Sequence, residues 1–267
     1  MVLLALFYLG GFGAVGWGAL LAWGLAVFKR RVGGLRPEGE GRRVTGAMTR
    51  VFSIALASLL ATHASAQTLD VLMIGDSVFE WNGAASVPQI MSADPRLKIR
   101  DESVGGARFS HPRRLFVGPM DIRAQVPRLP FDWVVITGGA NDLAVECGCE
   151  VCDATVDTLI SDDGVLGEIP DFLTDLTSDG LQVLWAQYYA PPATGGPFTA
   201  CVDELVEINA RLTALAETND AIHLVNLAEA IDPGDLSLYD PDLVHPSPAG
   251  SAKIAAFLIE KINTLRP

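Results

Sequence analysis

The sequence has little positive charge outside its first quarter. Residues 67–267 hold 12 Lys and Arg residues against 30 Asp and Glu residues, which gives this part a formal charge of −18. Because phosphate binding needs a basic surface, we expect no nucleic acid among its partners. The sequence also has no internal repeats, and with 49% hydrophobic residues its composition excludes collagen-like, coiled-coil and disordered proteins.

Charged residues are absent from residues 2–28. This apolar run can span a bilayer, which needs about 20 residues. Residues 29–50 then carry seven basic and two acidic residues, and the positive-inside rule keeps such a loop cytoplasmic. Two interpretations remain open. Residues 1–28 are a transmembrane segment followed by a basic linker over 29–47, or residues 1–47 are an upstream extension and translation starts at Met48.

Residues 48–66 are typical of a secretory signal peptide. Arg50 gives a positive start, residues 51–61 are apolar, and Ala64-Ser65-Ala66 is a small-residue cleavage site. No cysteine lies near this site, which argues against a lipid anchor. We therefore expect residues 67–267 to form one exported domain. It is periplasmic or secreted, or membrane-anchored through residues 2–28 if residues 1–47 are retained.

Four short apolar runs and one weaker pattern in the exported part predict β-strands. The apolar runs cover residues 69–74, 133–136, 181–188 and 223–227, and the weaker strand pattern covers residues 97–104. Such runs are typical of strands that are buried on both faces of a parallel sheet. Helical spacing recurs over 202–215 and 254–265, with Ser247 as the expected N-cap of the last helix, and weaker patterns cover 151–160 and 168–178. The alternation predicts a three-layer α/β/α sandwich with a five-stranded parallel sheet.

Polar motifs follow four of these predicted strands. They are Gly75-Asp76-Ser77, Gly105-Gly106-Ala107, Gly139-Ala140-Asn141-Asp142 and Asp242-Leu243-Val244-His245. Each motif alone also fits a turn, a helix cap or a salt bridge. Because the carboxyl ends of parallel strands form one edge of the sheet, where ligands bind, the four motifs together predict one site.

The side chains of these motifs suit acyl transfer. Ser77 is a weak nucleophile that needs a base, His245 can supply it, and Asp242 can hold the imidazole tautomer. The backbone N–H groups of Ser77 and Gly106 and the side-chain amide of Asn141 can stabilise an oxyanion. The sequence contains no G-x-S-x-G motif, which argues against an ordinary α/β-hydrolase.

On these four motifs, in this order, the sequence resembles the SGNH (GDSL-like) hydrolase family over residues 68–265. The resemblance implies a flavodoxin-like sandwich and ester hydrolysis without a metal or cofactor. It also implies a catalytic triad of Ser77, His245 and Asp242 and an oxyanion hole of Ser77, Gly106 and Asn141. Gly105 is the alternative to Gly106, which we prefer because the small Ala107 follows it. The resemblance does not fix the substrate.

Four cysteines lie in the exported part: Cys147, Cys149, Cys152 and Cys201. An even number in an exported domain favours two disulfides, in one of three pairings. A zinc site and four free thiols are the alternatives. A bond to Cys201 would join two loops beside the predicted site.

Several side chains near the motifs have either a functional or a structural interpretation. Phe79, Trp81 and Tyr188 line a substrate pocket or pack in the core. Arg108 belongs to a basic stretch between Arg96 and Arg128, which either guides an anionic substrate or is simply solvated. His111, Arg113 and Arg114 lie in the same stretch, and we expect His111 to be a surface residue.

We therefore predict an exported, monomeric serine esterase that acts on a small acyl ester, either a short-chain lipid or an acetylated carbohydrate. One alternative keeps the same site but transfers the acyl group to a sugar hydroxyl, as a cell-envelope O-acyltransferase. Another is a binding module that keeps the fold without catalysis.

Overall fold

The computed structural model describes residues 67–110 and 118–266. These residues lie in the second of two compact units of the chain, Ser65–Pro267. The expectations for residues 1–66, and those for His111, Arg113 and Arg114, fall outside the described residues. In the described ranges, no helix is both long enough and apolar enough to cross a bilayer.

Five parallel strands form the central sheet, in the order β2-β1-β3-β4-β5. Their bounds are Leu69–Ile74 for β1, Leu97–Asp101 for β2, Trp133–Ile136 for β3, Gln182–Gln187 for β4 and Ile222–Asn226 for β5. All five predicted strands are confirmed. The second is three residues shorter than expected, because the Asp101 carboxylate accepts hydrogen bonds from the N–H and hydroxyl of Ser103 and turns the chain there.

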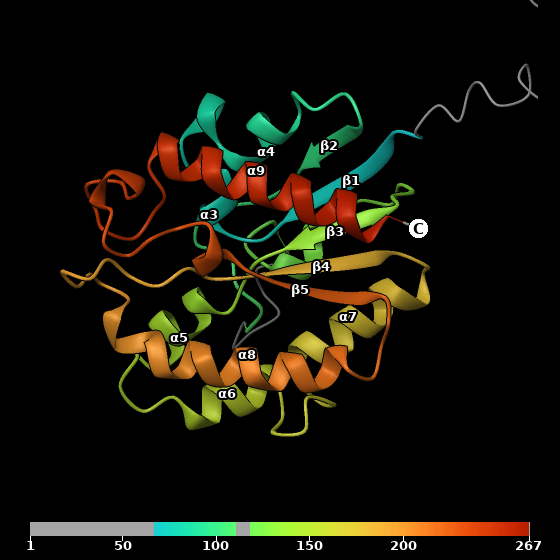
Figure 1. The fold of residues 1–267 in the computed structure, drawn as a ribbon. Coiled ribbons are helices and arrows are strands. Elements are labelled where there is room, and N and C mark those ends of the chain that lie inside the picture. Colours follow the sequence, from blue (N-terminus) through green and yellow to red (C-terminus); the bar gives the residue numbers. More distant parts are fainter. Residues whose placement is uncertain (1–66, 111–117, 267) are drawn as a thin grey trace, which may run out of the picture. The chain divides into compact units, whose positions relative to one another are not determined.

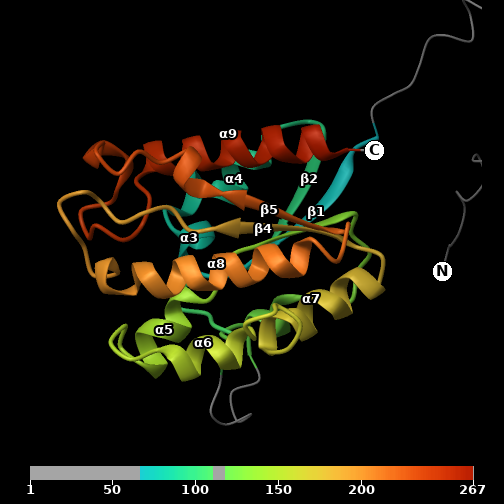
Figure 2. The same cartoon turned by 60° about the horizontal axis from the view of Figure 1, so that its bottom comes forward.

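Helices cover both faces of this sheet, so the predicted three-layer sandwich is confirmed (Figures 1 and 2). One face carries α4 (Val87–Met91) and α9 (Pro248–Leu265). The other carries α5 (Ala140–Glu146), α6 (Asp153–Leu159), α7 (Glu168–Ser178) and α8 (Val202–Ala216).

The two faces of the sheet have separate hydrophobic cores. Side chains alternate along a strand, so Val71 and Met73 pack with the α9 layer, while Leu72 and Ile74 pack with the layer of α5 to α8. This double burial explains why β1, β3 and β4 are nearly continuous apolar runs in the sequence, whereas the edge strand β2 is apolar only at alternate positions.

Helix α9 begins where the sequence predicts. The Ser247 hydroxyl accepts a hydrogen bond from the N–H of Gly250 at 3.2 Å, and Pro248 occupies the first turn. Ile254, Leu258 and Ile262 are fully buried beneath the helix. Their burial contributes about 1.5–3 kcal/mol each and fixes the helix, and therefore the loop before it, against the sheet.

Three helices that the sequence patterns do not predict are α3 (Ser77–Glu80), α4 and α5. They span four, five and seven residues, so each offers at most about two turns in which a helical repeat of apolar residues could show. Both α3 and α5 begin directly after a strand and carry a motif residue in their first turn.

Candidate active site

Ser77, His245 and Asp242 form a hydrogen-bonded chain at the carboxyl edge of the sheet. The His245 Nε2 atom lies 2.7 Å from the Ser77 Oγ atom, and the Nδ1 atom lies 2.5 Å from Asp242 Oδ2. The other Asp242 oxygen accepts from the backbone N–H groups of Val244 and His245 at 2.9 and 3.0 Å. With Nδ1–H donating to Asp242, Nε2 can accept the proton of the Ser77 hydroxyl.

The environment of Asp242 keeps this carboxylate ionised. Partial burial acts to raise the pKa of Asp242, but the hydrogen bonds from His245 and Val244 outweigh it and hold the pKa below its usual value. Asp242 is therefore an anion over the whole physiological pH range and can stabilise a positive imidazolium on His245.

Local backbone geometry places Ser77 in the first turn of α3. Gly75, which directly follows β1, has a φ of +135°, and a Cβ atom there would lie 2.4 Å from the carbonyl oxygen of Thr137. Only glycine can hold this position. Asp76 then caps α3 by accepting from the N–H of Val78 at 3.0 Å, which leaves the Ser77 hydroxyl at the strand end.

Further contacts hold the loop that carries His245, and the sequence motifs give no sign of them. The Asn82 amide donates to the carbonyl oxygen of Pro246 at 2.8 Å and to the Ser251 hydroxyl at 2.9 Å. The Tyr189 hydroxyl donates to the carbonyl oxygen of Val244 at 2.7 Å. These bonds connect the His245 loop to the segment after α3, the segment after β4 and helix α9, so three separate parts of the chain position the imidazole.

The indole of Trp81 stacks on the imidazole of His245. The ring centroids lie 3.8 Å apart and the planes differ by 9°. Since Asp242 holds the edge of the imidazole and Trp81 covers one face, the ring has little freedom to rotate away from Ser77.

The predicted oxyanion donors surround the same space as the Ser77 hydroxyl. Ser77, Gly105, Gly106 and Asn141 all line one cavity. Gly106 has a φ of +77°, a left-handed backbone that favours glycine, whereas Gly105 does not. The Asn141 amide donates to the carbonyl oxygen of Ala107 at 3.1 Å, which fixes its direction.

A buried carboxylate joins the two oxyanion loops. Asp142 is completely buried and accepts from the N–H groups of Phe109 and Ser110 and from the Ser110 hydroxyl. Burial raises the pKa of Asp142, and the hydrogen bonds from Ser110 oppose this rise. This cluster holds the loop after β2, which contains Gly106, next to helix α5, which contains Asn141.

A second buried carboxylate lies behind Ser77. Asp76 is 2% exposed, and its Oδ2 atom accepts from the Tyr188 hydroxyl and, at 3.5 Å, from the Asn141 amide. Burial raises the pKa of Asp76, although the hydrogen bonds from Tyr188 and Val78 act against it. Burial and the neighbouring Asp76 also raise the pKa of Tyr188 well above its ordinary value, so the phenol stays protonated and remains a donor.

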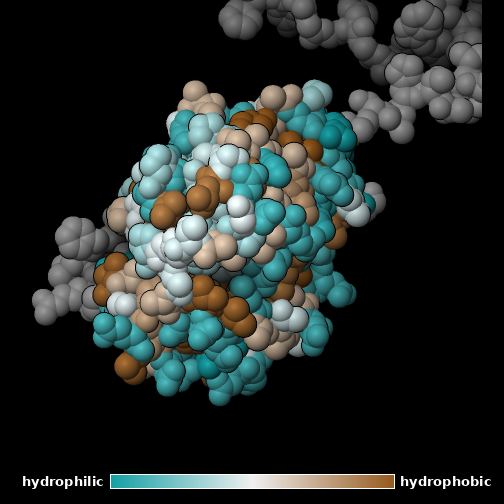
Figure 3. Space-filling view, turned by 60° about the vertical axis from the view of Figure 1, so that its left-hand side comes forward, coloured by the Kyte–Doolittle hydropathy of each residue, from teal (hydrophilic) through white to brown (hydrophobic). Residues whose placement is uncertain are grey.

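The cavity has a volume of about 360 Å³ and mostly apolar walls. Figure 3 brings forward the side of the molecule where the strands end and shows apolar residues among polar ones near its centre. The residues that line the cavity outside the four motifs are Val78, Trp81, Tyr188, Tyr189, Pro191, Phe198 and Leu205.

Two of the four expected pocket residues lie elsewhere. Trp81 and Tyr188 line the cavity, but Phe79 is fully buried in the core beneath α4 and α9, because it lies on the opposite side of α3. Arg108 is directed to helix α5, where its guanidinium pairs with Glu146 at 3.0 Å. Of the two interpretations of Phe79, packing in the core is therefore the one that holds, and neither Phe79 nor Arg108 lines the described cavity.

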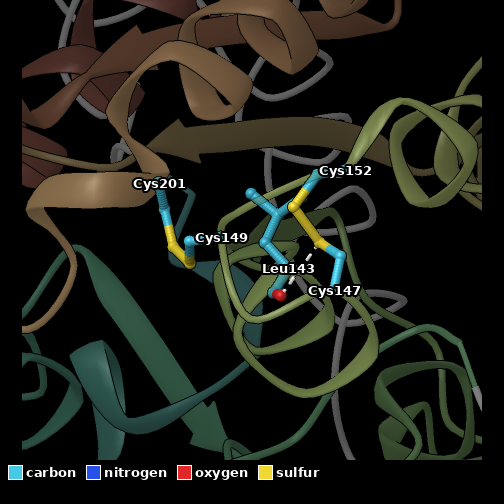
Figure 4. The surroundings of a disulfide bond; sticks show 5 residues. All are labelled: Leu143, Cys147, Cys149, Cys152 and Cys201. Atoms are coloured by element: carbon cyan, nitrogen blue, oxygen red, sulfur yellow. Dashed lines mark hydrogen bonds between the residues drawn. A yellow bond between two sulfur atoms is a disulfide. The ribbon is translucent and has the colours of Figure 1, made fainter.

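The four cysteines form two disulfides, shown in Figure 4. Cys147 pairs with Cys152 within the turn between α5 and α6, and Cys149 pairs with Cys201, which precedes α8. The second bond joins the two loops beside the site. Among residues 67–110 and 118–266 there is no group of three or more His, Cys, Asp or Glu side chains that could hold a metal ion.

The sheet order and the four loops that meet at its edge have the architecture of SGNH hydrolases. A protein from Slackia heliotrinireducens described as an SGNH hydrolase is 20% identical, with a TM-score of 0.50 and coverage of 73% of this chain and 100% of the other. Est24, a carbohydrate acetylesterase from Sinorhizobium meliloti, is 17% identical, with a TM-score of 0.51 and coverage of 74% and 100%. At these identities the likeness shows the fold alone.

Sequence similarity assigns the family. Residues 73–253 match the GDSL-like Lipase/Acylhydrolase family, and the chain belongs to this family of esterases and acylhydrolases. No protein with curated annotation has a matching sequence.

Proposed function

We propose that this protein is an exported serine esterase that hydrolyses carboxylic esters through a covalent acyl-enzyme. The observation that carries the proposal is the hydrogen-bonded chain from Ser77 through His245 to Asp242, which lies at the wall of a cavity large enough for a small ester. An apolar cavity next to an activated hydroxyl suits an uncharged ester substrate.

In the first half of the reaction, His245 Nε2 takes the proton of the Ser77 hydroxyl while the Ser77 oxygen attacks the ester carbonyl carbon. The carbonyl oxygen becomes an oxyanion and accepts hydrogen bonds from the N–H groups of Ser77 and Gly106 and from the Asn141 amide. His245 then gives its proton to the leaving alcohol oxygen. The ester carbon–oxygen bond breaks, and the acyl group stays on Ser77.

In the second half, His245 takes a proton from a water molecule that attacks the acyl-enzyme. The second tetrahedral intermediate uses the same oxyanion donors, and its collapse returns the proton to Ser77 and releases the carboxylic acid. Asp242 stays ionised throughout and stabilises the imidazolium in both halves.

Two parts of this proposal depend on features outside the described site. Export depends on the signal-peptide pattern over residues 48–66. The choice of water over a sugar hydroxyl as acceptor separates hydrolysis from acyl transfer, and product analysis with and without an acceptor sugar distinguishes the two.

The test is hydrolysis of short-chain nitrophenyl esters by the purified protein with its disulfides formed. Ser77→Ala should lower kcat by at least about 1,000-fold, because no other group replaces the nucleophile. The exposed Ser178 at the end of α7 offers a matched control, and Ser178→Ala should keep full activity. Equal activity of Ser77→Ala and wild type, or failure of wild type to react with a serine-directed phosphonate, would refute the proposal.

A further inference from the structure

One wall of the cavity comes from the segment that follows β4. Pro191, Phe198 and Leu205 line the cavity and bring only apolar side chains to it. Across the whole cavity, as far as the chain is described, no Lys, Arg or Glu side chain takes part in the lining. This wall therefore offers hydrocarbon surface and no partner for a charged or strongly polar group.

The three directions around the reacting carbon determine which part of an ester meets this wall. The leaving oxygen must face His245, and the carbonyl oxygen must face Gly106 and Asn141. The acyl chain takes the remaining direction. Phe198 and Leu205 pack with the layer of α5 to α8, whereas the His245 loop leads into α9 on the other face of the sheet.

The position of α8 beside α5, the helix that carries Asn141, supports the same direction for the acyl chain. A Cβ atom on Gly139, which precedes Asn141 by two residues, would lie 3.8 Å from the Cδ1 atom of Ile208. Leu205 stands nearly one helical turn before Ile208 on α8. Phe198 and Leu205 therefore stand on the α5 side of the site, while the chain before Phe198 also reaches the His245 loop, where a Cβ atom on Gly196 would lie 2.7 Å from the carbonyl oxygen of Leu243.

A disulfide fixes this wall in place. Cys201 lies between Phe198 and Leu205, is fully buried, and bonds to Cys149 just beyond helix α5 (Figure 4). Phe198, Leu205 and Cys149 pack against the same core. The bond therefore holds the apolar wall at a constant distance from the helix that carries Asn141.

We propose that Phe198 and Leu205 are specificity-determining residues that form an acyl-chain wall, so that the enzyme prefers esters of uncharged acyl chains of several carbons over acetyl esters. This inference rests on the esterase function proposed above and narrows its substrate class. An acetyl group has no chain to reach the wall, whereas a butyryl or hexanoyl chain replaces water along it.

The test is a panel of p-nitrophenyl esters from acetyl to decanoyl, which varies the acyl chain and keeps the alcohol constant. For wild type, kcat/KM should rise by about fourfold for each methylene that reaches the wall, since burial of one CH₂ contributes about 0.8 kcal/mol. The rise should stop when the wall is covered. A flat profile, or the highest kcat/KM with the acetyl ester, would overturn the inference.

Substitutions in the wall make the test specific. Leu205→Trp should fill the space and lower kcat/KM for hexanoyl esters by at least tenfold while acetyl ester hydrolysis changes less than threefold. Leu205→Ala and Phe198→Ala should move the preferred length to longer chains. The matched control is Val206→Trp, because Val206 is the next residue of α8 and is 61% exposed. Its profile should equal that of wild type.

The outcomes separate this inference from the esterase proposal. If the wall variants react with a serine-directed phosphonate and hydrolyse esters but keep the wild-type chain-length profile, the inference is wrong and the esterase function stands. If a second panel, with a constant acyl group and varied alcohols, shows that Leu205→Trp changes alcohol selectivity instead, the assignment of the wall to the acyl chain is wrong. If wild type neither hydrolyses esters nor reacts with the phosphonate, the esterase proposal itself fails.

Discussion

The two disulfides should contribute very different amounts to stability, and this difference can be measured. The Cys149–Cys201 bond joins residues 52 positions apart, whereas the Cys147–Cys152 bond joins residues only five positions apart. The loss of chain entropy in the unfolded state gives about 4 kcal/mol for a closed loop of the first length and about 2 kcal/mol for the second. The free energy of unfolding should therefore fall about twice as much when the long bond is removed.

The two double alanine variants form a matched pair. Each removes one deeply buried cysteine, since Cys201 is 0% and Cys152 is 2% exposed, so the packing losses are similar. For a domain of about 200 residues, we expect Cys149→Ala with Cys201→Ala to lower Tm by about 8–16 °C. Cys147→Ala with Cys152→Ala should lower it by about 4–8 °C.

Thermal unfolding followed by circular dichroism gives Tm, and urea unfolding gives the free energy of unfolding, for both variants and wild type, with dithiothreitol added to a second set of samples. Reduced wild type should be less stable than either variant, because both bonds are then open. An equal loss in the two variants, or a larger loss for the short bond, would refute the loop-entropy reasoning.

Three further predictions concern the site. Trp81→Leu should lower kcat by about 2- to 30-fold, since an aromatic face stabilises the stacked imidazolium by about 0.5–2 kcal/mol. Trp81→Phe should retain most of the activity. An effect on KM alone would contradict a role of Trp81 in stabilising the His245 imidazolium. Gly75→Ala should destabilise the fold by more than about 2 kcal/mol in urea unfolding, because its Cβ atom would meet a carbonyl oxygen at 2.4 Å, whereas Gly83→Ala, with nothing within 4 Å, should cost about 1 kcal/mol. Because burial raises the pKa of Asp76, this group favours folding at low pH and its contribution is lost as pH rises through the raised pKa. The free energy of unfolding of wild type, relative to that of Asp76→Asn, should therefore fall as pH rises above 4. A difference that stays constant from pH 4 to 8 would contradict the raised pKa.

The sheet and the meeting of the motifs were predictable from sequence for a definite physical reason. The central strands β1, β3 and β4 are buried on both faces and are therefore almost entirely apolar, so they stand out from amphipathic helices without an alignment. Parallel strands also bring their carboxyl ends to one edge, so Ser77 and His245 can be expected to meet although they lie 168 residues apart.

Which side chains line the cavity was less predictable, because this depends on the orientation of short elements that show no periodic pattern. Phe79 and Trp81 lie two residues apart in or beside a four-residue helix, and no periodic pattern shows which one faces the core. Arg108 pairs with Glu146 of α5, and this long-range contact has no signal in the sequence. The contribution of Phe198 and Leu205 depends on which cysteine Cys201 meets, and the sequence allows three pairings.

The order of the strands determines which properties of this protein can be altered independently by substitution. From β1 the chain passes to the α4 and α9 layer, and from β3 it passes to the layer of α5 to α8, so neighbouring central strands send their connections to opposite faces (Figure 1). Ser77 and His245 are thereby anchored in one half of the molecule, and Phe198 and Leu205, the proposed acyl-chain wall, pack in the other. Substitutions along α8 can retune substrate range without touching the proton-transfer pair, which leaves reactivity and selectivity free to vary independently.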